Sequence, residues 1–184
     1  MTPPTQLRAD VSLRPLGPEH AAAMLRWTQD PTVADNLGLR AAPSAERTAA
    51  WMASALGSAE VCPFAIYLGA ATDAAHVGNV ILDRIDAHLK TARLSIYIGE
   101  ASARGAGVGR AALHLALQRA FDPQGLDLYK VWLTVHARNQ AALQAYLAAG
   151  FTHEGTLRGE FLLRGERVDA LYLGALRAEI TPAR

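Results

Sequence analysis

Residues 104–110 read Arg104-Gly105-Ala106-Gly107-Val108-Gly109-Arg110, a glycine-rich segment with an arginine at each end, and are the most informative part of this sequence. It follows the apolar run 94–98, which has the composition of a strand, and it precedes the alanine-rich run 111–121, which has that of a helix. Glycines let the chain turn tightly and leave no side chain between the main chain and a ligand. The first amides of a helix lack acceptors and carry the positive end of its dipole. We therefore expect this turn to bind a phosphate group, with Arg104 and Arg110 adding charged hydrogen bonds.

Two common nucleotide-binding motifs fit this turn poorly. A nucleotide P-loop ends in Gly-Lys-Ser/Thr, whereas Gly109 is followed by Arg110 and Ala111. A dinucleotide fingerprint needs the spacing G-x-G-x-x-G, whereas the glycines here stand at positions 105, 107 and 109. These residues alone allow two interpretations: a tight turn that binds no ligand, and a turn that binds a different phosphate-containing ligand.

A second motif runs from Asn139 to Phe151, directly after the strand-like run 129–135. Asn139 is a good helix N-cap, and Gly150 is a good helix stop. Leu143, Tyr146 and Leu147 recur at helical spacing in between. Asn139 and Tyr146 are two helical turns apart, so they are expected on one face of this helix.

Together these motifs resemble the GNAT superfamily of acyl-CoA-dependent N-acetyltransferases. Arg104-x-x-Gly107-x-Gly109 resembles its pyrophosphate loop, and the run 139–151 resembles its second motif. Flanking segments resemble the branch that contains ribosomal-protein alanine N-acetyltransferases; they are 13–16, 25–27, 154–158 and 164–173. The resemblance implies an α/β (α+β) GNAT fold, with a mixed sheet of six or seven strands, a splayed central strand pair and helices on both faces.

The same resemblance implies acetyl-CoA as acyl donor and places its binding site. Main-chain groups of the central strand and of the glycine turn would hold the pantetheine and the pyrophosphate, and Asn139 would touch the pantetheine or nearby backbone. The implied cofactor-binding residues are Tyr97, Ile98, Arg104, Gly105, Ala106, Gly107, Val108, Gly109, Arg110 and Asn139.

The implied reaction is acetyl transfer to a primary amine, of a protein N-terminus or of a small molecule. Tyr146 stands where GNAT enzymes place the tyrosine that protonates the leaving thiolate. Arg93 stands near the position of the glutamate that relatives often use as a base. His136, at the end of the run 129–135, is then the candidate base because its pKa is near neutral. A loop histidine without a catalytic role is the open alternative for it. Two further alternatives are a relay water held by Ser95 and proton transfer to bulk water without any base.

The acceptor pocket is expected between the early helices and the last hairpin. Trp27, Asp30 and Asn36 are the candidates for substrate contact. Further candidates are Trp51, Arg158 and Asp169. Each of these side chains also has an ordinary structural explanation, such as packing or an ion pair. A non-catalytic acyl-CoA-binding sensor is the alternative function.

Composition sets the remaining expectations. The 184 residues and the formal charge of +1 suit one domain, residues 1–184, with no general attraction to nucleic acid or membranes. One cysteine, Cys62, cannot form an intramolecular disulfide, and the histidines show no metal-ligand spacing. No apolar run approaches the length of a membrane span, so we expect a cytoplasmic protein without bound metal. A homodimer through the closing strands is compatible with the family resemblance.

Hydrophobic patterning and turn residues predict the order of elements. Helices are expected at 18–29 and 44–56, with a loop over 30–43 between them. Strands are expected at 7–14, 61–68 and 76–84, and a hairpin at 151–163 and 168–176.

Overall fold

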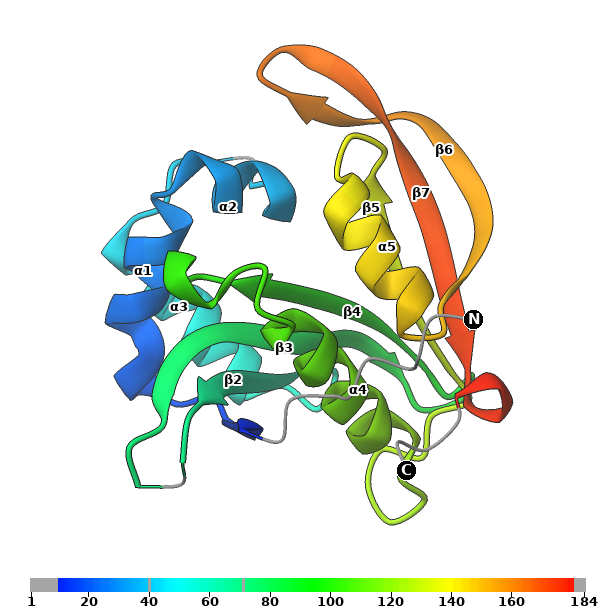
Figure 1. The fold of residues 1–184 in the computed structure, drawn as a ribbon, viewed down its shortest axis with the longest axis horizontal. Helices are drawn as coiled ribbons and strands as arrows, with labels where there is room; N and C mark the ends of the chain where they lie inside the picture. The colour runs from blue at the N-terminus through cyan, green and yellow to red at the C-terminus, as the bar shows by residue number, and fades with distance from the viewer. Residues whose placement is uncertain (1–9, 40, 71, 181–184) are drawn as a thin grey trace.

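The computed structural model describes residues 10–39, 41–70 and 72–180, and its elements form a mixed sheet with helices on both faces (Figure 1). The strands are β1 (Val11–Pro15), β2 (Cys62–Leu68), β3 (Ala75–Asp86), β4 (Thr91–Ile98), β5 (Lys130–His136), β6 (Thr152–Leu163) and β7 (Glu166–Leu176). The helices are α1 (Ala21–Thr28), α2 (Pro31–Leu37), α3 (Ala45–Leu56), α4 (Val108–Phe121) and α5 (Gln140–Ala148). Short 3₁₀ turns lie at Pro18–His20, Ala101–Ala103 and Arg177–Glu179.

The seven strands follow the order β1-β2-β3-β4-β5-β7-β6. Neighbouring strands run antiparallel, except that β4 and β5 are parallel. The parallel pair needs a crossover connection, and the glycine turn and α4 supply it. This arrangement confirms the GNAT fold expected from the two motifs.

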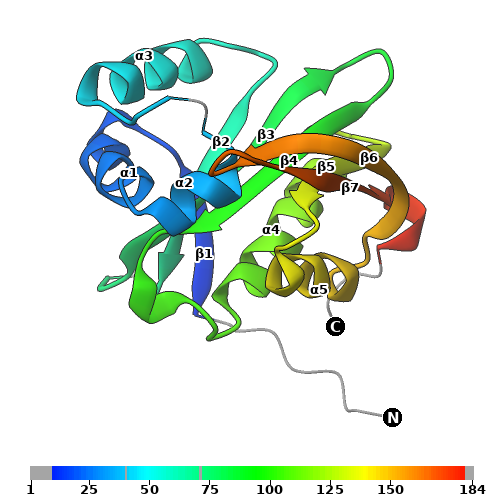
Figure 2. The same cartoon turned by 90° about the horizontal axis from the view of Figure 1, so that it is seen from above.

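The two faces of the sheet bury different helices (Figure 2). Ile66 packs in the large cluster with residues of α4, whereas its neighbour Ala65 packs with Met24 of α1 and Met52 of α3. Successive side chains of a strand point to opposite faces, so this alternation places α4 on one face and α1 and α3 on the other. Helix α5 packs beside α4.

Most predicted elements appear close to their expected bounds, but the predicted loop over residues 30–43 is wrong. Residues Pro31–Leu37 form α2. Asp30 caps this helix by accepting a hydrogen bond from Thr32 N at 2.9 Å, Pro31 occupies its first turn, and Gly38 ends it in the left-handed conformation at φ 62°. The predicted start of the first strand, at residues 7–9, lies outside the described residues.

Candidate functional site

The parallel strands β4 and β5 separate soon after they begin. They pair only at Thr91–Lys130, Ala92–Val131 and Arg93–Trp132. Residues 94–98 of β4 have no partner on β5, and Figure 1 shows the two strands diverging. Backbone donors and acceptors on this side of β4 therefore need other partners, such as water or an extended ligand. The splayed central pair predicted from the family resemblance is confirmed.

The glycine turn lies after the end of β4 and starts α4. Gly107 is the N-cap of α4 with φ +81°, and Gly105 has φ +73°, both in the left-handed region that favours glycine. Because Gly107 has no side chain to cap the first turn, the helix start stays open to an anion. A Cβ at Gly105 would meet nothing within 4 Å. Val108, fully buried, anchors the turn in the core. These features fit the diphosphate of a nucleotide-containing cofactor.

The Arg104 side chain is directed back to the protein. Its guanidinium donates to the carbonyls of Ile98 at 2.9 Å and Gly99 at 2.8 Å, and it pairs with Asp30 at 3.0 Å. The amide of Thr32 and then Arg104 hold the pKa of Asp30 below its usual value. Arg104 thus joins the end of β4 to the start of α2, and Asp30 serves as both helix cap and ion-pair partner.

Trp27, a predicted substrate residue, is only 4% exposed. Its indole packs with Val33 and Tyr97, and its Nε1 donates to Glu100 at 2.9 Å. A Cβ at Gly99 would overlap the Trp27 ring, so the ring covers the backbone at the end of β4. Trp27 therefore supports the site from within the core and offers little surface to a substrate.

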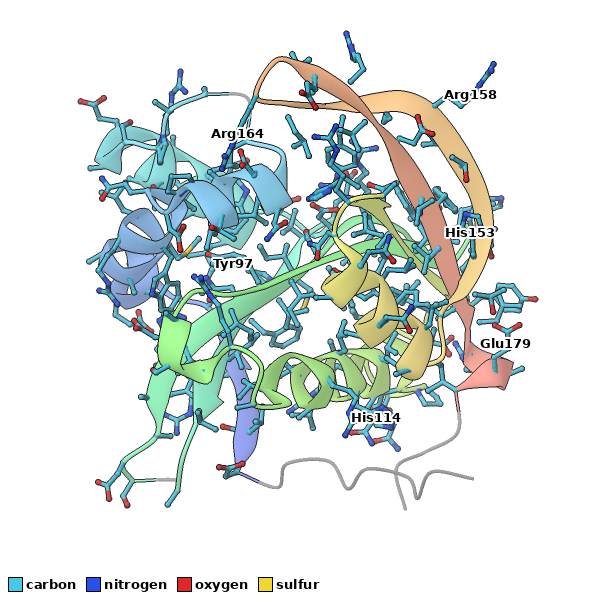
Figure 3. All side chains as sticks on the ribbon, turned by 45° about the horizontal axis from the view of Figure 1, so that its top comes forward. Tyr97, His114, His153, Arg158, Arg164 and Glu179 are labelled. Atoms are coloured by element: carbon cyan, nitrogen blue, oxygen red, sulfur yellow. The ribbon has the colours of Figure 1, made fainter. Side chains whose placement is uncertain are left out.

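Two tyrosines of the predicted site are buried. Tyr146 on α5 is 8% exposed, its ring packs edge-on to Phe151, and burial raises its pKa to about 12. Burial also raises the pKa of Tyr97 to about 12, and the Tyr97 hydroxyl accepts a hydrogen bond from Asn79 Nδ2 at 2.7 Å. Figure 3 shows Tyr97 under the region of α1 and α2. The Tyr97 side chain therefore packs in the core, and only the main chain of residue 97 is available to bind a ligand.

Three polar side chains from different parts of the chain meet at the open end of the splay. Asn36 Oδ1 lies 3.0 Å from His136 Nε2 and accepts from Asn139 Nδ2 at 2.9 Å. Asn139 also caps α5, because its Oδ1 accepts from Ala142 N at 3.1 Å. The structure therefore brings together one predicted substrate residue, the predicted base and one predicted cofactor residue.

His136 is 7% exposed at the end of β5. Burial lowers its pKa, and the cation of Arg138 acts in the same direction, while the carboxylate of Asp35 opposes them. Its Nδ1 is buried without a hydrogen-bond partner in the described parts of the chain. The imidazole ring meets Phe161 of β6 edge-on.

A cavity of about 330 Å³ opens beside this cluster between α2 and the turn of the β6–β7 hairpin. Two ion pairs border it: Arg164 with Asp35 at 2.9 Å and Arg138 with Glu166 at 2.5 Å. No pattern in the sequence marks these four charged residues as part of a site, because only the fold brings residues 35 and 164 together. The complete lining is Thr32, Asp35, Asn36, His136, Arg138, Leu163, Arg164 and Glu166.

Other predicted residues lie away from this cluster. Trp51 is a surface residue of α3, 37% exposed. Figure 3 shows Arg158 projecting from the outer side of β6. Asp169 accepts from the amide of Gly159 at 2.8 Å within the hairpin. Arg93 forms a two-bond pair with Asp83 of β3, at 2.6 and 2.8 Å, so this position of β4 holds a structural ion pair.

Within residues 10–39, 41–70 and 72–180, no group of three or more His, Cys, Asp or Glu side chains is arranged to hold a metal ion. None of the helices in the described ranges has the length and apolar character needed to cross a membrane.

Known proteins resemble this chain in sequence and in fold. The family described as "Acetyltransferase (GNAT) domain" matches residues 10–152. Spermidine N(1)-acetyltransferase of Escherichia coli (strain K12) is 35% identical over 68 residues, which is 37% of this chain. That alignment spans 36% of the relative, so about a third of its length is matched.

Solved structures match over nearly the whole chain. Spermidine N-acetyltransferase from Vibrio cholerae, in complex with CoA and spermine, has a TM-score of 0.86 and 21% identity, covering 94% of this chain and 98% of that one. A dodecameric structure of spermidine N-acetyltransferase from the same organism has a TM-score of 0.78, 21% identity and coverage of 93% and 96%. At this identity the likeness shows the fold alone.

These relatives are spermidine acetyltransferases and not ribosomal-protein alanine acetyltransferases, so the branch predicted from the flanking segments gains no support from them. The superfamily itself is established by the family match, which covers more than half of the chain and contains both motifs. The chain belongs to the GNAT acetyltransferase family.

Proposed function

We propose that this protein transfers the acetyl group of acetyl-CoA to a primary amine, with polyamines as the acceptor class. The observation that carries the proposal is the splay of β4 from β5 next to the uncapped, glycine-rich start of α4. An extended pantetheine fits the open edge of β4, and a diphosphate fits the helix start.

The residues of the turn bind through their backbone. The Arg104 amide donates to Ala101 O at 3.2 Å, so the amides that would bind the anion are those of residues 105–110, and the left-handed conformations of Gly105 and Gly107 shape the turn. On β4, Tyr97 and Ile98 offer main-chain groups; the Ile98 carbonyl already accepts from Arg104 and keeps one lone pair. Asn139 is close enough to the splay to contact the pantetheine once its amide leaves Asn36.

Acetyl-CoA supplies a thioester whose sulfur leaves as a thiolate. Tyr146 holds a proton for that sulfur, because a buried phenol with a pKa near 12 stays protonated at neutral pH. An amine with a pKa near 10 is itself protonated at pH 7, at a cost of about 4 kcal/mol to reach the neutral form. The site therefore also needs a group that accepts the amine proton.

The polyamine acceptor is supported by the names of the relatives and by the charges of the cavity. Asp35 and Glu166 line the cavity, and each is paired there with an arginine. An ammonium group of a polyamine can replace either guanidinium as the partner of these carboxylates. Peptide N-termini carry a single ammonium group and would use one carboxylate at most.

The test is release of free thiol from acetyl-CoA in the presence of different amines. The panel contains spermidine, spermine, amino sugars, aminoglycosides and alanine-starting peptides. We expect amine-dependent thiol release that is fastest with the polyamines. Turnover with peptides only would show that peptide N-termini, and not polyamines, are the acceptors. Thermal stabilisation by acetyl-CoA without turnover of any amine would favour a non-catalytic sensor.

Self-association is a further part of this proposal, because a relative of the same fold forms a dodecamer. Strand β6 lies at the edge of the sheet and has many exposed side chains, which is a surface suited to a second copy. Light scattering during size-exclusion chromatography would give the mass in solution. A monomer at all concentrations would contradict it.

A further inference from the structure

Helix α2 forms one wall of the cavity proposed to take the amine, and little apolar packing holds it there. Thr32, Asp35 and Asn36 line the cavity, and Figures 1 and 2 show α2 between α1 and the tip of the β6–β7 hairpin. All seven residues of α2 are described, and Val33 is its one buried side chain. A helix this short is unstable without tertiary contacts, so polar contacts at its two ends decide where α2 lies.

The contacts at the C-terminal end of α2 include two that bound ligands would replace. Asp35 pairs with Arg164 at 2.9 Å, and Asn36 accepts a hydrogen bond from Asn139 at 2.9 Å. In the proposed reaction an ammonium group takes the place of Arg164, and the Asn139 amide turns to the pantetheine. The position of α2 in the loaded enzyme then depends on the contact of Asn36 with His136 and on the contacts at its N-terminal end.

Asp30 ties the N-terminal end of α2 to two other elements. One carboxylate oxygen, Oδ1, accepts from the Thr32 amide at 2.9 Å and caps the helix. The other, Oδ2, accepts from Arg104 Nη2 at 3.0 Å. The Asp30 amide donates to the Trp27 carbonyl at 3.0 Å, which fixes the turn between α1 and α2. Each oxygen of this carboxylate thus has its own partner, outside the lining of the amine cavity.

Arg104 is built into the end of β4. Its Nε donates to the Ile98 carbonyl at 2.9 Å, and its Nη2 donates to the Gly99 carbonyl at 2.8 Å as well as to Asp30. Its own backbone amide donates to the Ala101 carbonyl at 3.2 Å. Three of the five N–H groups of the guanidinium are used in this way, in the planar arrangement that arginine offers. The two carbonyls hold the cation where it meets Asp30.

This ion pair is suited to fixing geometry more than to adding stability. The Arg104 and Asp30 side chains are 33% and 37% exposed, and pairs of this exposure contribute little to the free energy of unfolding. Because backbone carbonyls orient the guanidinium, however, the pair sets the distance between the start of α2 and the end of β4. We propose that Arg104 is a positioning residue that holds the α2 wall of the amine cavity against β4, and that its side chain is not a ligand of the CoA diphosphate.

This inference rests on the proposed acetyl transfer and names a residue that sets the acceptor site. In that proposal the diphosphate lies against the backbone amides of residues 105–110, so it does not need the Arg104 side chain. The amine nitrogen must reach the thioester carbon beside β4 from a cavity whose wall is α2. A misplacement of about 1 Å can cost roughly 100-fold in rate. Loss of Arg104 should therefore act on the amine and leave CoA binding unchanged.

Three substitutions separate this role from its alternatives. Arg104→Met removes the cation and keeps an unbranched side chain. Asp30→Asn removes the charge and keeps the helix cap, because asparagine caps a helix as well as aspartate does. Arg26→Met is the matched control: Arg26 pairs with Glu100 and joins α1, not α2, to the segment after β4. Both ion pairs are partly exposed, so all of these variants should fold.

The first experiment does not use activity. Amide hydrogen exchange, followed by NMR, reports on the backbone hydrogen bonds of α2, such as that from Ala34 N to Asp30 O at 2.9 Å. Arg104→Met and Asp30→Asn should lose protection in residues 34–38, with α4 as an unchanged internal reference. Arg26→Met should keep this protection. Unchanged protection of α2 in both Arg104→Met and Asp30→Asn would overturn the inference.

The second experiment measures the affinity for CoA by calorimetric titration. We expect dissociation constants within about twofold of the unchanged protein for every variant, because backbone amides hold the diphosphate. Loss of a charged hydrogen bond to a phosphate would weaken binding roughly 10–100-fold. Such a loss in Arg104→Met alone would show that the guanidinium binds the diphosphate, and it would overturn the inference.

The third experiment measures steady-state kinetics with spermidine. The kcat/KM for spermidine should fall roughly 10–100-fold in Arg104→Met and in Asp30→Asn, chiefly through KM. The double variant should be no slower than either single one, because both substitutions break the same contact.

Equal KM values in all proteins, or the same rise of KM in Arg26→Met, would overturn the inference and leave acetyl transfer intact. No turnover by the unchanged protein with any amine would instead contradict the proposed function. The exchange experiment would still decide whether Arg104 holds α2 in place.

Discussion

Asn36 and His136 are 100 positions apart in the chain, yet Asn36 Oδ1 lies 3.0 Å from His136 Nε2. Asn36 belongs to α2, which packs beside β4, and His136 ends β5. Their hydrogen bond therefore joins the two sides of the splay at its open end. The acetyl-CoA proposed to bind between β4 and β5 would lie near this hydrogen bond.

Replacing Tyr146 by Phe should lower kcat by roughly 10²–10⁴-fold, the usual contribution of a positioned general acid. The CoA affinity should stay the same, because only a hydroxyl at a buried position is removed. Steady-state kinetics and calorimetry measure the two effects separately. Because burial keeps the phenol pKa near 12, the rate of the unchanged protein should show no loss from Tyr146 ionisation up to about pH 10. Equal turnover of the two proteins would remove the tyrosine from the mechanism.

Gly107 and Gly109 make a matched pair within the turn. Gly107→Ala places a side chain at φ +81°, which should cost about 1–2 kcal/mol of unfolding free energy. Gly109 lies inside α4, and a Cβ there would meet only the Ile98 side chain at 3.8 Å. Gly109→Ala should therefore be neutral or stabilise by up to about 1 kcal/mol. Denaturant unfolding measures both changes, and a reversed order would show that the turn has another shape.

The hydroxyl of Tyr97 should matter for stability and not for cofactor binding. Tyr97→Phe leaves the amide of Asn79, which is fully buried, without its acceptor, at a cost of about 1–3 kcal/mol. The main chain of residue 97 is unchanged, so the affinity for CoA should hold. A variant of normal stability that has lost CoA binding would place the Tyr97 side chain in the cofactor site.

Stability should fall as the pH is lowered from about 7 to about 5.5. Burial lowers the pKa of both His76 and His136 in the folded protein. The unfolded chain, with histidine pKa values near 6.5, then binds protons first and is favoured as the pH falls. Chemical unfolding across this range measures the slope, and His76→Gln should reduce it. A stability that is constant or rises toward pH 5.5 would contradict the burial of these neutral rings.

Residue types within short segments predicted the helix caps, turns and hairpin of the fold. The cap at Asn139, the glycine turn and the last hairpin follow from residue types that favour one backbone conformation. The splay followed from family resemblance, since no local pattern shows where two strands stop pairing. Helix α2 was missed although its signals were present: Asp30 and Pro31 mark its start and Gly38 its end. Seven residues with few apolar positions gave too little periodicity to detect it.

The sequence predicted which residues belong to the candidate site, but it did not predict how they contact one another. Asn36, His136 and Asn139 were each proposed for a different role, and the structure joins them by hydrogen bonds. Such contacts depend on how α2 packs beside β4, which is a tertiary property with no signature in spacing. Trp27 was predicted from its position near the early helices, yet its burial against Gly99 makes it a supporting residue.

Acetyl-CoA is proposed to bind along the open edge of β4 and at the start of α4. Backbone amide resonances, followed by NMR while CoA is added, test this claim residue by residue. We expect the amides of residues 94–98 and 105–110 to shift and to exchange more slowly with solvent. Saturation with CoA that leaves both segments unchanged, or no binding at all, would contradict it.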